Sequence, residues 1–248
     1  MPRFFVPIEN IKDNKILIDT DDVWHITKVL RMNEGDEIVA CDGKGYDYRA
    51  TISKITKNEI ICDINERLQS KTEPPVRVTL YQGIPKGTKM EYIIQKTTEL
   101  GISDIVPVAM KRCVSKMDND KSGKKKLERW NKICAEAAKQ SQRGIVPVVH
   151  EPISFDEAIA GLKTNELYFA PYECEEQQGL RTVLTSKTDV KTVGFMIGPE
   201  GGYDLLEVER LKENGIQTVT LGKRILRTET AGEAVLAMLM YEIGDINM

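Results

Sequence analysis

The chain has 248 residues, of which 41% are hydrophobic, 29% charged and 6% aromatic, and its net charge is −3. No apolar run approaches the roughly 18 residues of a membrane-spanning helix, and the opening MPRFFVPIENIKD lacks the apolar core of a signal peptide. Five cysteines form no CxxC pair and the two histidines stand far apart, so neither a disulfide scaffold nor a zinc site is expected. These features favour a cytoplasmic globular protein with reduced cysteines and no metal.

Short β-strands are predicted throughout residues 1–72. Runs such as 36–42 and 46–55 are rich in β-branched and aromatic residues, and glycine-containing turns separate them. A helix is predicted over 21–32, and its buried apolar side is expected to hold four residues: Trp24, Ile26, Val29 and Leu30. So many strands in so short a segment favour a small β-barrel. The polar, proline-ended sequence SKTEPP separates it from the rest of the chain.

Apolar strands and helices alternate from residue 73 to 248. Strands such as VRVTLYQGI and TVGFMIG are each followed by helical patterns. This alternation predicts a mostly parallel sheet with helices on both faces. The helix predicted over 88–101 has apolar residues at i, i+3, i+4 and i+7, and Gly101 is placed to end it.

The segment 111–143 is strongly basic. It carries eleven Lys and Arg against four Asp and Glu, hence +7 in an otherwise acidic chain. Such a segment is typical of a surface that binds a polyanion, although a solvated helix face beside a polar loop gives the same pattern. Near its end, Glu136, Gln140 and Arg143 follow helical spacing. That face is either an exposed helix end or a polar wall of a site.

Two glycine-bearing turns follow apolar strands near the C-terminus. The first is Gly198-Pro199-Glu200-Gly201-Gly202, and the second is Leu221-Gly222 with the basic loop behind it. Because ligands of α/β sheets bind beyond the carboxyl ends of the strands, the two turns are expected to face one crevice. Neither turn matches GxGxxG or GxxxxGK(S/T), which disfavours a Rossmann dinucleotide site or a P-loop, and a plain strand-to-helix turn stays open. Thr230 with Glu233 predicts a capping box for the last helix.

Together these stretches resemble the bacterial 16S ribosomal RNA (uracil-N3)-methyltransferase family of the SPOUT superfamily. The resemblance covers nearly the whole chain, the segment 151–190 being the least distinctive. Its blocks are MPRFFV, HITKVLRMNEGDEI, KGTKMEYIIQKTTELGISDIVPV, ERWNKICAEAAKQSQRGIVPVV, IGPEGGYDLLEVE and LGKRILRTETAGEAVLAML.

The resemblance implies a domain organisation and an activity. Residues 1–72 would form a PUA-like β-barrel that helps to hold RNA, and residues 73–248 a SPOUT-type α/β domain whose last segments thread a trefoil knot. The knot comes only from the resemblance, because threaded chains are almost absent among proteins. The implied protein is a homodimer that uses S-adenosyl-L-methionine to methylate N3 of a specific uridine in 16S ribosomal RNA or the small ribosomal subunit.

The resemblance also implies site residues. The methyl donor has an adenosine and a cationic sulfonium but no phosphate, so its site needs free backbone groups and aliphatic side chains. The implied donor-binding residues are Gly198, Gly201, Gly202, Leu221, Gly222, Ile225, Leu226, Arg227, Thr230 and Ala231. The expected RNA contacts are Arg3, Lys28, Arg31, Lys111, Arg112, Lys124, Lys125 and Lys126.

Catalysis is expected to rest on positioning and charge. Arg227 and Arg143 are candidates to stabilise the negative charge that develops on uracil as N3 loses its proton, and Glu136 or Glu200 to accept that proton. Two other function classes stay open. One is a non-catalytic RNA-binding module, and the other an α/β enzyme that acts on a small nucleoside-like molecule.

Overall fold

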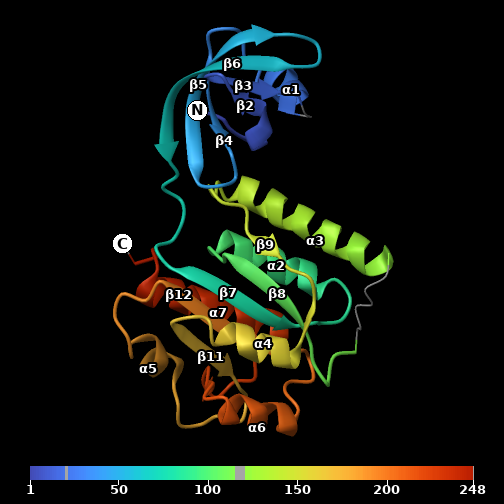
Figure 1. The fold of residues 1–248 in the computed structure, drawn as a ribbon, viewed down its shortest axis with the longest axis vertical. Helices are drawn as coiled ribbons and strands as arrows, with labels where there is room; N and C mark the ends of the chain where they lie inside the picture. Colours follow the sequence, from blue (N-terminus) through green and yellow to red (C-terminus); the bar gives the residue numbers. More distant parts are fainter. Residues whose placement is uncertain (20–21, 115–120, 248) are drawn as a thin grey trace. The chain divides into compact units, whose positions relative to one another are not determined.

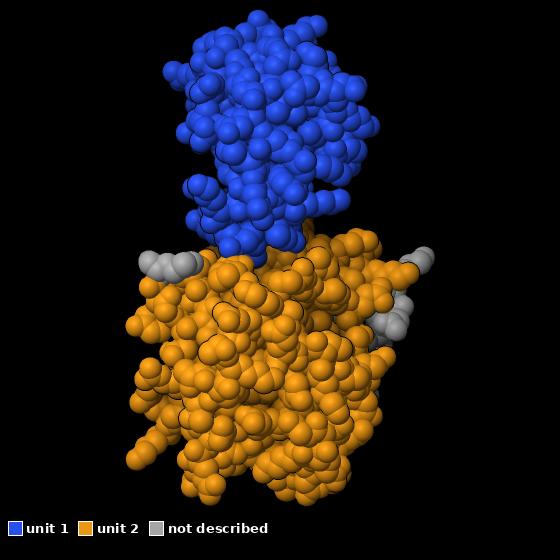
Figure 2. All heavy atoms as spheres, turned by 60° about the vertical axis from the view of Figure 1, so that its left-hand side comes forward, with its two compact units in different colours: residues 1–73, 138–146 blue, residues 74–137, 147–248 orange. Residues whose placement is uncertain are grey.

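The computed structural model describes residues 1–19, 22–114 and 121–247. These residues form two compact units, which Figure 2 distinguishes by colour. Unit 1 comprises residues 1–73 and 138–146, and unit 2 comprises residues 74–137 and 147–248. The segment 138–146 therefore folds with the N-terminal part of the chain although it lies far along the sequence.

Unit 1 is built on a β-sheet. In its described residues six strands follow the spatial order β1-β4-β5-β6-β3-β2, and only the β1–β4 pair is parallel. The elements are β1 (Arg3–Phe5), η1 (Ile8–Asn10), β2 (Ile11–Lys12), β3 (Lys15–Ile18), β4 (Glu37–Cys41), β5 (Tyr46–Ile55) and β6 (Ile60–Gln69). Buried side chains alternate along β5, where Tyr48, Ala50 and Ile52 point into the core. The β-rich N-terminal domain that the sequence predicts is confirmed.

The helix predicted over 21–32 differs from expectation. Asp22–Trp24 (α1) is continued by a π-helical stretch, His25–Val29 (η2), in which the Leu30 N–H donates to the His25 carbonyl at 2.9 Å. The wider π turn changes which residues share a face. Ile26 is buried as predicted, but Trp24, Val29 and Leu30 are 64%, 49% and 40% exposed. Val23 takes the second buried position.

Unit 2 is built on a parallel sheet. Its spatial order is β10-β8-β7-β12-β11-β13, with β9 also beside β8, and every pair among the described residues is parallel. The strands are β7 (Arg77–Gly83), β8 (Asp104–Ala109), β9 (Val148–Val149), β10 (Ile153–Ser154), β11 (Leu167–Pro171), β12 (Thr192–Ile197) and β13 (Gln217–Val219).

Helices pack on both faces of this sheet (Figure 1). α2 (Lys89–Glu99), α3 (Lys121–Gln140), α5 (Leu180–Leu184) and α7 (Thr228–Ile243) pack on one face, and α4 (Phe155–Leu162) and α6 (Leu205–Glu213) on the other. The strands serve both cores because successive side chains point to opposite faces. In β12, for example, Phe195 joins the first core and Met196 the second. The predicted α/β fold is confirmed, while the trefoil knot stays a prediction because strand order does not report threading.

Helix ends agree with the sequence in one case and differ in another. α2 ends before Gly101, whose φ is +97°, as predicted. The capping box predicted at Thr230 and Glu233 is wrong, because α7 begins two residues earlier at Thr228 and Arg227 occupies its cap position without a side-chain hydrogen bond. None of the described helices is long and apolar enough to cross a membrane.

Candidate active site

A cavity of about 830 Å³ lies in unit 2, beyond the carboxyl ends of three strands. Its walls are the segment after β11, the turn after β12 and the loop after β13, together with Ala231 of α7. Since β11 pairs with both β12 and β13, the three chain segments leave the sheet side by side. This is the edge at which open α/β sheets bind ligands. The two glycine turns predicted to face one crevice do line the same cavity.

The first glycine turn, 198–202, is folded back on itself. A Cβ on Gly198 would lie 3.2 Å from the Gly202 carbonyl carbon, and the Gly202 N–H donates to the Pro199 carbonyl at 2.9 Å. Gly202 has φ +66°, and a Cβ there would lie 2.5 Å from Oε1 of Glu173. A side chain would be crowded at Gly198 and, given the positive φ, strained at Gly202, so glycine at both positions leaves backbone groups at the cavity wall.

A buried hydrogen-bond chain ties this turn to the start of α7. The Thr228 hydroxyl donates to the Gly198 carbonyl at 2.6 Å and accepts from Nε2 of Gln82 at 2.9 Å. Gln82, at the end of β7, also donates to the Gly83 carbonyl at 3.0 Å. The Gln82 amide nitrogen donates to both of these oxygens, so the NH₂ group must point toward them. The amide oxygen, Oε1, then points away and is buried without a hydrogen-bond partner among the described residues. These hydrogen bonds connect the 198–202 turn to the start of α7, the two segments that form this side of the cavity.

Glu200 is held as a charged group at the edge of the turn. Its carboxylate accepts from the Lys86 N–H at 3.0 Å and pairs with the Lys89 ammonium at 3.2 Å. Burial acts to raise the pKa of Glu200, but the backbone hydrogen bonds and Lys89 together lower that pKa on balance. A carboxylate with a lowered pKa and engaged oxygens is a weak proton acceptor.

An acidic wall faces the glycine turn, and sequence analysis did not identify it. Glu173, Glu175 and Glu176 line the cavity in the segment after β11. The Thr218 hydroxyl, which donates to Glu175 at 2.6 Å, together with backbone hydrogen bonds lowers the pKa of Glu175. The available signal was position: three glutamates directly follow a buried strand whose neighbours carry the glycine turns.

The predicted donor-binding residues gather with one exception. All line the cavity except Thr230, which is exposed on α7. Arg227 lines the cavity at the start of α7, and Ile225 in the loop before it is 85% exposed. One wall of the cavity is therefore the 198–202 turn, held by hydrogen bonds, and another is the more exposed loop before α7.

Glu136 and Arg143 do not line this cavity. The helical spacing predicted to place them on one face is wrong, because α3 ends at Gln140 and Gln142 has φ +59°. Arg143 belongs to unit 1 and is 3% exposed. Its guanidinium pairs with Glu73, whose Oε1 also accepts the N–H of Gly144 at 2.8 Å and of Ile145 at 3.0 Å.

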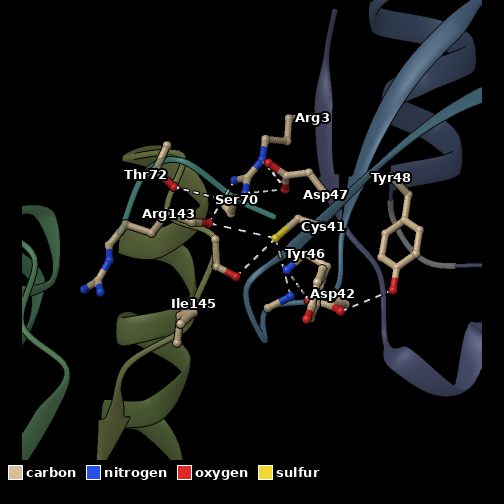
Figure 3. Close-up of polar contacts among 12 residues, drawn as sticks. Arg3, Cys41, Asp42, Tyr46, Asp47, Tyr48, Ser70, Thr72, Arg143 and Ile145 are labelled. Carbon is tan, nitrogen blue, oxygen red and sulfur yellow. Dashed lines mark hydrogen bonds and ion pairs between the residues drawn. The ribbon is translucent and has the colours of Figure 1, made fainter. Parts of the chain in front are cut away.

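The segment 143–146 joins the sheet of unit 1 through a polar network (Figure 3). Arg3 donates to the Arg143 carbonyl at 2.9 Å and pairs with Asp47 at 2.8 Å. The Cys41 thiol, whose pKa burial raises to about 11, donates to the Gly144 carbonyl at 3.5 Å. The expectation of Arg3 as an RNA contact is therefore corrected: its donors are used inside the unit, and its side chain is only 14% exposed.

The other expected RNA contacts differ in their surroundings. Lys28, Arg31, Lys124 and Lys125 are exposed, and the Lys126 ammonium lies 5.0 Å from the ring centroid of Trp130. Lys111 pairs with Asp204 at 2.9 Å, and Arg112 donates to the Gly201 carbonyl at 2.8 Å. Arg112 thus supports the glycine turn from outside the cavity. The stretch 115–120 of the basic segment lies outside the described residues.

The described residues contain no group of three or more His, Cys, Asp or Glu side chains placed to hold a metal ion.

Comparisons with known proteins agree on a family. Residues 72–240 match the RNA methyltransferase domain family, and residues 18–65 match the RNA methyltransferase PUA domain family. The chain is 37% identical over 249 residues to ribosomal RNA small subunit methyltransferase E of Bacillus subtilis, covering 98% of this chain and 97% of that protein. It is 31% identical to the protein of that name from Aquifex aeolicus, covering 94% and 96%.

A solved structure extends this similarity to the fold. The ribosomal RNA small subunit methyltransferase E of Neisseria gonorrhoeae, crystallised with S-adenosyl methionine, is 33% identical and superimposes with a TM-score of 0.83 over 99% of both chains. Both units are thus matched by sequence and by fold. The chain belongs to the ribosomal RNA small subunit methyltransferase E family of RNA methyltransferases.

Proposed function

We propose that the protein transfers a methyl group from S-adenosyl-L-methionine to N3 of a uridine in 16S ribosomal RNA. The observation that carries the proposal is the cavity of about 830 Å³, in which the 198–202 turn and the 220–228 loop meet. Its volume lies in the range of sites that enclose a nucleoside-sized ligand. Family membership supports the same activity.

The residues of the cavity fit the donor chemically. The glycine turn leaves backbone groups at the wall because Gly198 and Gly202 carry no side chain. Leu221 and Leu226 provide aliphatic surface for an adenine ring. The glutamates of the acidic wall complement a cationic sulfonium. The donor supplies the electrophilic methyl group.

Arg227 is the proposed catalytic residue. It lines the cavity and is exposed there, so its guanidinium can face a base brought to the site. As N3 of uracil loses its proton, charge spreads to the two carbonyl oxygens, and a nearby guanidinium stabilises that charge more in the transition state than in the ground state. Arg143, buried with Glu73, is left out of this step.

No proton acceptor is assigned. The lowered pKa of Glu200 and its pairing with Lys89 make it a poor base, and Glu136 lies outside the cavity lining. In the proposed reaction water accepts the N3 proton of uracil, and the positive charge of Arg227 favours the loss of that proton.

We further propose the division of labour and the setting of the enzyme. Unit 1 helps to hold RNA, and unit 2 binds the donor and performs the transfer, in the cytoplasm where ribosomal RNA is found. Lys124, Lys125 and Lys126 supply phosphate contacts, so affinity for RNA should fall as salt rises. Replacing all three by alanine should flatten that salt dependence.

A homodimer is proposed through α7 and α2. Met238 and Tyr241 of α7 and Tyr92 of α2 are exposed apolar side chains in unit 2. Exposed apolar patches of this kind mark association surfaces. Light scattering after size-exclusion chromatography should give twice the mass of one chain. The double variant Met238→Glu, Tyr241→Glu should give the mass of a single chain.

The donor site is tested by calorimetry with S-adenosyl-L-methionine. Gly202→Ala should weaken binding because φ is +66° and the new Cβ displaces the Glu173 carboxylate that lines the cavity. Gly215→Ala is the matched control, since Gly215 has φ +72° but open space around it and lies outside the cavity. Equal binding by wild type and both variants would contradict the site.

The reaction is tested by mass mapping of 16S ribosomal RNA after incubation with enzyme and labelled donor. A single N3-methylated uridine is expected. Donor binding without transfer to RNA, but with transfer to free uridine, would favour the small-molecule enzyme instead. Absence of donor binding would favour the non-catalytic RNA-binding module.

A further inference from the structure

Unit 1 exposes a tryptophan on the helical stretch α1–η2. The chain has two tryptophans, and they contrast sharply: Trp130 is 1% exposed in the core of unit 2, whereas Trp24 is 64% exposed. An indole exposed to this extent loses much of the burial that normally favours this residue. Its exposure follows from the π turn, which buries Val23 and Ile26 on one side.

The outward face of this stretch combines apolar and cationic groups. One helical turn beyond Trp24 lie Lys28 and Val29, both exposed, and Arg31 is exposed just after the helix. His25 packs its ring edgewise on Phe4, with 6.3 Å between the centroids, which anchors the turn to β1. Asp22, an acid at the start of the helix, pairs with Lys139 at 2.8 Å. The face therefore carries positive charge beside an indole, in a protein whose net charge is −3.

Arg31 occupies an unusual backbone conformation. Its φ is +54°, the left-handed region that glycine and asparagine adopt most readily. The conformation ends the π turn, with the Met32 N–H donating to the Ile26 carbonyl at 3.0 Å. An arginine at this position accepts backbone strain that a glycine would avoid, and its side chain is exposed three residues after Lys28. Strained residues of this kind are found at functional sites.

We propose that Trp24, Lys28 and Arg31 form a stacking site for one unpaired nucleobase of the RNA substrate. The indole would stack on the base, and the two cations would contact the flanking phosphates. Aromatic rings with interleaved cations are how proteins hold single-stranded RNA, since every base has a π face. The charge of the face selects a polyanion over an apolar protein segment. The inference rests on the proposed function, because it specifies how the RNA is held.

The direct test is intrinsic fluorescence of the full-length protein titrated with a single-stranded oligouridine of about ten nucleotides. Because Trp130 is buried, quenching on binding should come from Trp24. Trp24→Phe should lose the quenching but keep most of the affinity, and Trp24→Ala should lower affinity about tenfold. Leu205→Ala is the control, because Leu205 is 67% exposed on α6 and should leave the affinity unchanged. A blunt RNA duplex of equal length should bind without quenching.

Arg31→Gly separates recognition from structure. Glycine relieves the strain, so the melting temperature should stay equal or rise, while affinity for the oligouridine falls and its salt dependence weakens. If Arg31 only ended the helix, RNA affinity would not change.

Methylation of 16S ribosomal RNA distinguishes this inference from the proposed function. Trp24→Ala should raise KM for RNA with little change in kcat, as loss of a binding contact requires. Normal methylation by wild type together with unchanged affinity and KM in Trp24→Ala would overturn the stacking site alone. Absence of RNA binding and methylation in wild type would overturn both. A change of oligomeric state in Trp24→Ala without a change in RNA affinity would instead identify a protein interface.

Discussion

The loop 222–227 of unit 2 and the segment 143–146 of unit 1 each carry a predicted catalytic arginine near a glycine, but they hold it differently. Arg227 is exposed and lines the cavity. Arg143 is buried, and its guanidinium pairs with the carboxylate of Glu73, which also accepts the N–H groups of Gly144 and Ile145. An arginine whose donors are used inside the fold stabilises that fold, and one that faces a cavity can act on a ligand.

The largest effect is expected at Arg227. Arg227→Ala should lower kcat about 100- to 1,000-fold, the loss typical of removing one group that stabilises transition-state charge. Affinity for S-adenosyl-L-methionine should change only a few-fold, since the side chain acts on the base. Single-turnover methylation and calorimetry measure the two quantities, and a normal rate would remove Arg227 from the mechanism.

The matching replacement at Arg143 should change stability instead. Arg143→Met leaves Glu73 without its counter-ion in a mostly buried setting, so the free energy of unfolding should fall by about 2–4 kcal/mol. Chemical denaturation measures this, with Arg77→Met as an exposed control. A double-mutant cycle with Glu73→Gln should recover part of the loss. A fall in kcat at unchanged stability would restore Arg143 to the catalytic list.

A smaller effect is expected at Gln82. Like Arg143 it is buried, but it hydrogen-bonds Thr228, which lines the cavity. Gln82→Leu removes the hydrogen bonds to Thr228 and the Gly83 carbonyl, and it also removes the unpartnered Oε1. Stability should therefore change little, while donor affinity falls about tenfold as the 198–202 turn loosens. Calorimetry compares it with Gln95→Leu, an exposed position on α2. Equal donor affinities in the wild type and Gln82→Leu would show that the Gln82–Thr228–Gly198 hydrogen bonds have no role in donor binding.

The smallest effect concerns acid stability. Burial acts to raise the pKa of Asp104, but His150 at 2.8 Å and Arg77 at 3.0 Å lower it on balance below the ordinary 3.8. The Asp104–Arg77 ion pair therefore stabilises the protein fully above pH 3.8, and its contribution is lost as pH falls through the lowered pKa of Asp104; His150 adds an ion pair only while its ring is protonated. Since both partners are largely exposed, about 1 kcal/mol or less is involved. Asp104→Asn should flatten the stability curve in this acid range, and an unchanged curve would contradict the assignment.

Local patterns in the sequence were sufficient for most elements of the fold. The strand β5 and the helix α2 match the predicted runs, because period-two and period-3.6 patterns are set by residues close in the chain. The two glycine turns were placed correctly for the same reason, since each directly follows a buried strand. What failed depended on local departures from ideal geometry: the π turn that exposes Trp24, and the end of α3 before Arg143.

The sequence by itself determined the family, the alternation of strands and helices, and the two turns that line the cavity. Only the tertiary structure decided which charged groups are available. Arg3 and Arg143 look no different from Arg227 in the sequence, yet partners 44 and 70 residues away, Asp47 and Glu73, occupy them. It likewise brought the glutamates after β11 to the cavity, because strand order in a parallel sheet is set by long-range packing. Availability of a charge is a property of its surroundings, and those are assembled from distant parts of the chain.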